Sequence, residues 1–214
     1  MQYLFAICLV LFVFFPSHGQ EGTTSIDYFD RDSKRVPDTI FRKEVKAYEF
    51  KPGDTIADIG AGSGYFEKVL SMYRDNLVVY ATDIMPGVLT SLSAKLEELR
   101  LNDNKNIEYN TVLGQSKSTL LPFKTFDKVI VRNTFHHFSY PDEMLQNCRE
   151  VLKDRGKLYI VDILVDETTG PPRCHAHLTR ETFLNYLTRN GFILANETDL
   201  HYDDFKCFEF HLAN

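Results

Sequence analysis

The stretch IADIGAGSGYF, residues 56–66, carries the strongest structural signal in this 214-residue chain. A short apolar run that contains Asp58 leads directly into three alternating glycines, Gly60, Gly62 and Gly64. Glycine allows positive φ and lets the backbone approach a ligand with no Cβ between them. A strand that ends in such a turn is typical of a nucleotide or nucleoside site in an open parallel sheet.

The spacing of these glycines excludes two common phosphate-binding motifs. The dinucleotide motif G-x-G-x-x-G would need its third glycine at position 65 or 67, where the chain has Tyr65 and Glu67. The triphosphate loop needs Lys and then Ser or Thr after its last glycine, but Gly64 is followed by Tyr65. Asp58 would also repel a nearby phosphate, so it favours a ligand with a cationic group.

Hydrophobic patterning predicts strands that alternate with helices along most of the chain. The predicted strands are residues 55–59, 77–82, 107–113, 127–132, 157–164, 192–197 and 206–212. The predicted helices are residues 37–50, 64–73, 86–101, 141–153 and 179–190. This alternation indicates right-handed crossovers and a mostly parallel sheet. The last two strands have no helix between them, so we expect them to pair antiparallel.

The pattern Asp58-x-Gly60-x-Gly62-x-Gly64 resembles the first motif of the class I S-adenosylmethionine-dependent methyltransferases. The resemblance covers roughly residues 36–212. It implies an α/β fold, a Rossmann-like three-layer sandwich whose seven-stranded, mostly parallel sheet has the order 3-2-1-4-5-7-6 with the last strand antiparallel. It also implies S-adenosylmethionine as cofactor, with the glycine loop around its methionine part and Asp58 near its amino group.

Five further residues are expected to hold that cofactor. Asp83 ends the second predicted strand, where a carboxylate can accept hydrogen bonds from both ribose hydroxyls. Dinucleotide-binding proteins use the same device, and Asp83 could equally cap the following helix. Ile84 could pack on the adenine ring. Gln115 or Ser116 stands where the family usually presents an acid to the adenine amino group, and Asn133 is a candidate for holding the methionine part.

His136 and His137 are the predicted catalytic residues, in the segment VRNTFHHF that ends the fourth predicted strand. A neutral imidazole can act as a general base near neutral pH. The alternative is a structural role, because adjacent side chains point apart and at most one is expected to face the site. Methyl transfer depends mainly on aligning the nucleophile, the methyl carbon and the sulfur.

No metal site is predicted. The segment that follows the fifth predicted strand contains Cys174, His175 and His177 near Asp166 and Glu167. This spacing matches no standard zinc pattern, and histidines two positions apart converge only on an extended backbone. These residues are therefore expected to be loop residues that line the acceptor pocket.

The cysteines do not form a disulfide framework. Cys148, Cys174 and Cys207 are an odd number at wide spacing once Cys8 is removed with a leader peptide. We expect buried or half-buried thiols. A thiol trio for arsenite methylation is not expected, because Cys148 falls in a predicted helix and Cys207 in a predicted strand.

The first residues differ in composition from the rest. Residues 1–15 have no charged side chain, and the apolar run 3–15 is shorter than the roughly 20 residues of a membrane span. Ser17 and Gly19 occupy the small-residue positions of a signal-peptidase site. We predict a signal peptide over residues 1–19, export to the periplasm or medium, a flexible lead-in over 20–35 and a methyltransferase domain over 36–214. The alternative is an uncleaved membrane anchor at 3–15.

Charge bears on the acceptor. The chain has 30 acidic and 24 basic residues, a formal net charge of -6, which argues against a nucleic-acid partner. The predicted function is in-line methyl transfer from S-adenosylmethionine to a small molecule, without stable membrane insertion once the signal is removed. A non-catalytic S-adenosylmethionine or nucleoside-binding protein and a nicotinamide-dependent oxidoreductase are the alternatives. The segment around Gly170-Pro171-Pro172 resembles a bacterial subgroup of these methyltransferases with export signals.

Overall fold

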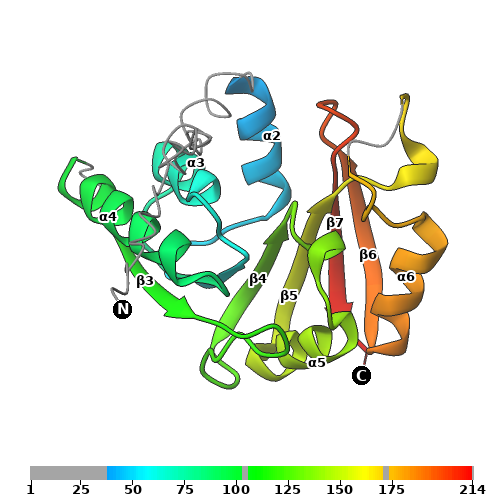
Figure 1. The fold of residues 1–214 in the computed structure, drawn as a ribbon. Helices are drawn as coiled ribbons and strands as arrows, with labels where there is room; N and C mark the ends of the chain where they lie inside the picture. Colours follow the sequence, from blue (N-terminus) through cyan, green and yellow to red (C-terminus); the bar gives the residue numbers. More distant parts are fainter. Residues whose placement is uncertain (1–37, 103–105, 171–173, 214) are drawn as a thin grey trace, which may run out of the picture.

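The computed structural model describes residues 38–102, 106–170 and 174–213 (Figure 1). Its strands are β1 Thr55–Ile59, β2 Leu77–Asp83, β3 Ile107–Leu113, β4 Phe126–Arg132, β5 Leu152–Asp162, β6 Phe192–Asp199 and β7 Lys206–Leu212. Its helices are α2 Asp38–Ala47, α3 Tyr65–Tyr73, α4 Pro86–Asn102, α5 Pro141–Val151 and α6 Arg180–Arg189, with 3-10 turns η1 Phe135–His137 and η2 Val165–Glu167. The predicted signal peptide, the lead-in, and Pro171 and Pro172 lie outside the described residues.

The strands form one seven-stranded sheet in the order β3-β2-β1-β4-β5-β7-β6, so the predicted order is confirmed. Strands β1 to β5 run parallel, with β1 between β2 and β4. β7 pairs antiparallel with both β5 and β6, as predicted for the last strand. The carboxyl ends of β1 to β5 therefore meet at one edge of the sheet, where ligands bind in open α/β folds.

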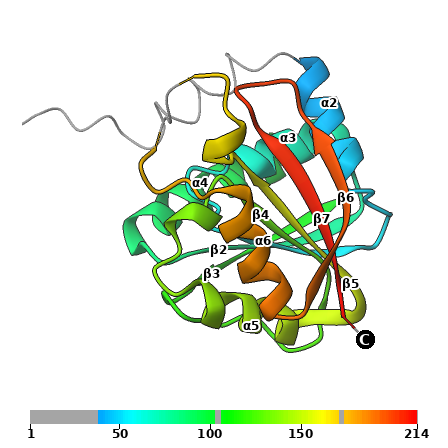
Figure 2. The same cartoon turned by 90° about the vertical axis from the view of Figure 1, so that its right-hand side faces the viewer.

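Helices cover both faces of the sheet, which makes a three-layer sandwich (Figure 2). Phe66 and Leu70 of α3 pack with Tyr48, which follows α2, and Leu92 of α4 packs on Ala81 in an adjoining cluster. On the other face, side chains of α5 and α6 share one core cluster with alternate residues of β4 and β5. Burial on both faces accounts for the near-continuous apolar runs of the inner strands.

The fifth strand differs from its prediction. α5 ends at Val151 and β5 begins at once, five residues before the predicted start at 157, and β5 ends at Asp162. The register with β4 shifts between Phe126 and Lys128, and the intervening part of β5 is polar and exposed. Residues 153–155 carry no apolar alternation, so the sequence pattern predicted a helix through residue 153 and no strand before residue 157.

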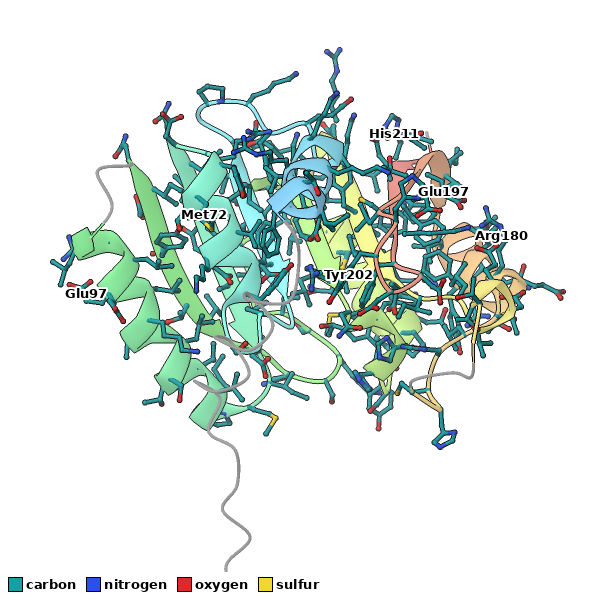
Figure 3. All side chains as sticks on the ribbon, turned by 90° about the horizontal axis from the view of Figure 1, so that it is seen from above. Met72, Glu97, Arg180, Glu197, Tyr202 and His211 are labelled. Atoms are coloured by element: carbon teal, nitrogen blue, oxygen red, sulfur yellow. The ribbon has the colours of Figure 1, made fainter. Side chains whose placement is uncertain are left out.

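An ion-pair cluster fixes the segment that follows β5. Arg180 of α6 contacts Glu167 of η2 at 2.9 Å and Glu197 of β6 at 2.6 Å. Lys206 of β7 contacts the same two carboxylates at 2.6 and 3.0 Å. Figure 3 shows Arg180 and Glu197 beside one another at the β6 side of the sheet. Each pair is partly exposed, but the shared network holds η2 against the sheet. No helix within the described residues is long and apolar enough to cross a bilayer.

Candidate active site

A cavity of about 750 Å³ lies at the carboxyl ends of the parallel strands. Nine predicted site residues line it: Gly60, Gly62, Asp83, Ile84, Gln115, Ser116, Asn133, His136 and His137. Two others, Asp58 and Gly64, are not among its lining residues. The loops after β1, β2 and β3 form one half of the cavity. The segments after β4 and β5 and the β6–β7 turn form the other half, and Tyr202 of that turn is labelled in Figure 3.

The glycine loop fits tightly between β2 and β4. Gly60 has φ 79° and donates its N–H to the Thr82 carbonyl at 2.8 Å. The Thr134 hydroxyl donates to the Gly60 carbonyl at 3.2 Å. A Cβ on Gly60 would lie 2.2 Å from Cγ2 of Thr134, so only glycine fits here. The loop therefore presents bare backbone to the cavity.

Asp83 holds the loop and the next helix with its two carboxylate oxygens. Oδ2 accepts the N–H of Gly62 at 3.2 Å, and Oδ1 accepts the N–H of Met85 at 2.9 Å. The second contact fixes the residue just before α4, so Asp83 orients the entry to that helix without accepting an N–H from within it. Each carboxylate oxygen can accept a further hydrogen bond, so the ribose-binding role remains available on the cavity side.

Asp58 lies behind the glycine loop, against Glu67 of α3. Asp58 is 2% exposed and Glu67 is fully buried. Neither oxygen of Glu67 has a donor partner among the described groups, so the two carboxyls can hydrogen bond only when one is protonated. Burial raises the pKa of Asp58 to about 7, although Glu67 and the charge of Arg132 partly oppose this. Burial and then the Asp58 charge raise the pKa of Glu67. Both shifts favour a proton on the pair near neutral pH, which reduces the negative charge expected from Asp58.

The remaining predicted cofactor residues lie at the rim. Gln115 and Ser116 are exposed in the turn after β3, where Gln115 pairs through its backbone with Ser118 at 2.7 and 3.2 Å. Ile84 is 56% exposed and Asn133 takes a left-handed φ of 51°. The Asn133 N–H donates to Val161 of β5 at 2.7 Å, which continues the sheet one residue beyond β4.

His136 is fixed by a buried carboxylate at the end of β5. Its Nδ1 lies 2.8 and 2.9 Å from the two oxygens of Asp162, and the two side chains are each 3% exposed. The N–H of Ile163 also donates to Asp162 at 2.8 Å. Since a carboxylate accepts, this contact places the imidazole proton on Nδ1 and leaves the Nε2 lone pair free.

Both histidines line the cavity, although adjacent side chains were expected to point apart. The tight η1 turn brings the His136 and His137 rings to 4.0 Å between centroids. The His177 ring lies 4.4 Å from His136, and its Nδ1 is buried without a hydrogen-bond partner. Burial, followed by repulsion from His136 when its ring is protonated, lowers the pKa of His137 and of His177.

The three cysteines lie in different parts of the fold, as expected. Cys148 is buried with α5 on one face of the sheet, and Cys207 is buried in the cluster on the other face. Cys174 is half-buried and lines the cavity. All three are free thiols, and burial raises the pKa of Cys148 and of Cys207. Cys148 and Cys207 belong to different core clusters, so the three thiols do not form one site.

Sequence reasoning missed Arg132 and its partner on α2. The Nε of Arg132 lies 2.7 Å from Glu44, which is 1% exposed and also accepts the Tyr48 hydroxyl at 2.8 Å. The guanidinium carbon of Arg132 lies 4.0 Å from the ring centre of Tyr65, at the start of α3. Arg132 and Tyr65 line the cavity, so this network joins α2 to its wall. A cation at the end of an apolar strand is the one sequence signal that could have drawn attention to it.

Comparison with known proteins agrees with this architecture. Residues 57–158 match the family model described as a methyltransferase domain. A solved methyltransferase described as SAM-dependent, from Aquifex aeolicus, superposes with a TM-score of 0.68 at 22% identity. That superposition covers 85% of this chain and 95% of the other, and it shows a shared fold.

Two curated relatives match part of the chain. The demethylmenaquinone methyltransferase of Thermotoga maritima is 30% identical over 135 residues, 61% of this chain and 53% of that protein. A Staphylococcus aureus protein named tyrosine recombinase XerC is 31% identical over 128 residues, 55% of this chain and 41% of that protein. The chain thus spans about half or less of the length of these relatives, and their names describe those proteins alone.

The sheet order, the methyltransferase-domain match over residues 57–158 and the methyltransferase relative all support the class I S-adenosylmethionine-dependent methyltransferase superfamily. The family and fold imply S-adenosylmethionine as the cofactor. The residues present fit that ligand, because Gly60 and Gly62 offer bare backbone and Asp83 offers a carboxylate at the end of β2.

Proposed function

We propose that this protein transfers a methyl group from S-adenosylmethionine to a small-molecule acceptor bound in the same cavity. The observation that carries the proposal is the continuity of the cavity, in which Gly62 and Asp83 line one half and His136 and His137 the other. When bound, S-adenosylmethionine supplies a methyl group on a cationic sulfur. A single shared cavity would keep the nucleophile and the methyl carbon close together and aligned.

One set of residues would hold the cofactor, and another would activate the acceptor. Gly60, Gly62 and Asp83 would hold the cofactor through backbone and carboxylate contacts. His136 and His137 remain the predicted general bases for an acceptor that must lose a proton. Asp162 would support this role, because it fixes the His136 tautomer and leaves Nε2 as the basic atom.

The test is binding followed by turnover. We expect calorimetry on the purified chain to show binding of S-adenosylmethionine and S-adenosylhomocysteine, and a panel of small hydroxyl, amine and thiol compounds to release S-adenosylhomocysteine. Binding with no release across the panel would favour a non-catalytic S-adenosylmethionine-binding protein. Tight NADH binding without affinity for S-adenosylmethionine would favour an oxidoreductase and overturn the proposal.

The proposal also covers where the protein acts in or outside the cell and which class of acceptor it uses. Residues 1–19 have the composition of a signal peptide, so we propose export with cleavage before Gln20. The net charge of -6 supports a small-molecule acceptor over a nucleic acid. Amino-terminal sequencing of the mature protein checks the export step, and a chain that keeps Met1 and stays in the cytosol would contradict it.

A further inference from the structure

The acceptor half of the cavity gathers three metal-ligating side chains from two distant segments. His136 and His137 come from η1, and Cys174 comes from the segment between η2 and α6. One ligand-type atom from each of these three residues lies within 4.8 Å of the other two. All three residues line the cavity. Imidazole and thiolate are the ligands that zinc and other borderline divalent ions prefer.

We propose that His136, His137 and Cys174 form a binding site for one divalent transition-metal ion of the zinc class. Three protein ligands with an open fourth position are the pattern of catalytic zinc sites, whereas structural sites are closed by four. Binding would convert the Cys174 thiol to thiolate and release its proton to solvent. The site uses Nε2 of His136, because Nδ1 is engaged by Asp162.

The contact between Asp162 and His136 is the first supporting observation. A histidine ligand usually donates its second N–H to a carboxylate, which fixes the ring and raises its basicity. Here both carboxylate oxygens lie within 2.9 Å of Nδ1, in a setting where both side chains are 3% exposed. This arrangement orients the free nitrogen before any ligand arrives.

His177 is the second, independent observation. It is 9% exposed, lines the cavity, and has a buried Nδ1 with no hydrogen-bond partner. It also belongs to a second ligand-type group, with His136 and Asp162, whose atoms lie within 4.8 Å of one another. A buried nitrogen without a partner is costly, and a nearby metal ion or its bound water would satisfy it.

No metal site was predicted from the sequence, because the prediction rested only on the local pattern Cys174-His175-x-His177. The structure places His175 in the solvent-exposed part of that segment, and it does not line the cavity. The partners of Cys174 come instead from η1, some forty residues earlier. Since this pairing depends on the fold, no local spacing rule reveals it.

A metal ion here would define the class of acceptor, and this part of the inference rests on the proposed function. An ion with an open position binds a hydroxyl or thiol of the acceptor and lowers its pKa. His136 and His137 then act as metal ligands in place of the general-base role, and the acceptor atom becomes nucleophilic through its contact with the ion. The expected acceptor is therefore a small molecule with a metal-binding hydroxyl or thiol.

The test measures metal binding directly on the full chain. After treatment with a chelator and removal of that chelator, we expect one Zn²⁺ or Co²⁺ per chain in competition with a chromophoric chelator. The cobalt form should show a thiolate charge-transfer band, because Cys174 would be a ligand. Cys174→Ser should abolish that band, and Asp162→Asn should weaken binding by about 10–100-fold.

The matched control is His175→Asn, which changes a histidine next to Cys174 that is exposed and does not line the cavity. It should leave affinity and the cobalt band unchanged. His137→Asn, in an exposed position, provides a second ligand variant if Cys174→Ser unfolds. Substoichiometric metal, or equal affinity in Cys174→Ser and His175→Asn, would overturn the proposal. Calorimetry with S-adenosylhomocysteine in the presence of a chelator tests cofactor binding separately. A protein that binds S-adenosylhomocysteine but no metal would contradict the metal site and leave the proposed function standing.

Discussion

Asp58 and Glu67 are a pair of buried carboxyl groups that face one another beneath the glycine-rich loop. They come from different elements, since Asp58 belongs to strand β1 and Glu67 to the first turn of helix α3. Two carboxylates in such a setting cannot both ionise at low cost, so they retain a proton near neutral pH. The stability of the loop that would hold the cofactor is therefore linked to pH.

The first prediction concerns that linkage. Burial raises the folded-state pKa of Asp58 to about 7, above its unfolded value near 4. Its contribution to stability is therefore fully present below about pH 4 and is lost as the pH rises through about 7. Glu67→Gln should flatten the fall in the free energy of unfolding between pH 5 and pH 8, because an amide can donate to ionised Asp58.

Urea unfolding at several pH values checks this prediction. The control is Glu97→Gln, which removes an exposed carboxylate paired with Arg100 at the surface (Figure 3). Its side chain is 54% exposed, so its effect on the pH profile should be small. Identical pH slopes in wild type and Glu67→Gln would show that the buried pair does not share a proton.

The second prediction tests Asp83 as the ribose ligand. Asp83→Ala removes a charged acceptor at the end of β2, and a hydrogen bond to a charged group contributes about 1.5–3 kcal/mol. We expect the Kd for S-adenosylhomocysteine to rise by about 10–100-fold in calorimetry. Asp154→Ala, at a side chain that is 89% exposed and outside the cavity, should leave the Kd unchanged. Equal affinity in the two variants would mean that another residue holds the ribose.

The third prediction concerns the close approach at Gly60. Gly60→Ala forces a Cβ to within 2.2 Å of Thr134 and requires φ near 79°. Strain at positive φ and overpacking together should lower the free energy of unfolding by at least about 2 kcal/mol. Gly87→Ala in α4 is the control, because no atom lies within 4 Å of its added Cβ. Thermal unfolding separates the two, and equal melting temperatures would contradict the tight fit.

The fourth prediction concerns the ion pair between Glu44 and Arg132. Removing one partner of a buried pair leaves the other charge unpaired, at a typical cost of about 3–5 kcal/mol. Glu44→Gln should therefore destabilise the protein strongly, whereas Glu97→Gln at the surface pair should cost less than about 1 kcal/mol. Chemical denaturation measures both. A small effect of Glu44→Gln would show that water reaches Arg132 through the cavity.

Much of the fold followed from the sequence because its signals are local. Glycine spacing, strand–helix alternation and the missing helix before β7 predicted the sheet, with the order 3-2-1-4-5-7-6 supplied by the resemblance to the methyltransferase family. Local signals also placed Asp83 and His136 at the carboxyl ends of their strands, where both line the cavity. The polar start of β5 lacked such a signal and was missed.

The rest of the site depends on contacts between distant segments. Asp162 meets His136 across neighbouring strands, and Glu44 reaches Arg132 from a helix that precedes β1. Asp58 was expected near the amino group of the cofactor. In the structure its side chain is buried within an inner strand and does not line the cavity. The side of the sheet on which the Asp58 side chain lies depends on its contact with Glu67, and the local sequence pattern does not predict that contact.

The insertion of β7 between β5 and β6 constrains the order of folding. Strands β1 to β5 can assemble in sequence, but β5 keeps an unpaired edge until residues 206–212 arrive, and β6 cannot join the sheet before them. Chain shortening before Lys206 would therefore leave the edge of β5 open and β6 outside the sheet, which favours association between molecules. Because the pairing of β7 with β5 joins segments far apart in the chain, closing the sheet at β7 should be a slow step in refolding.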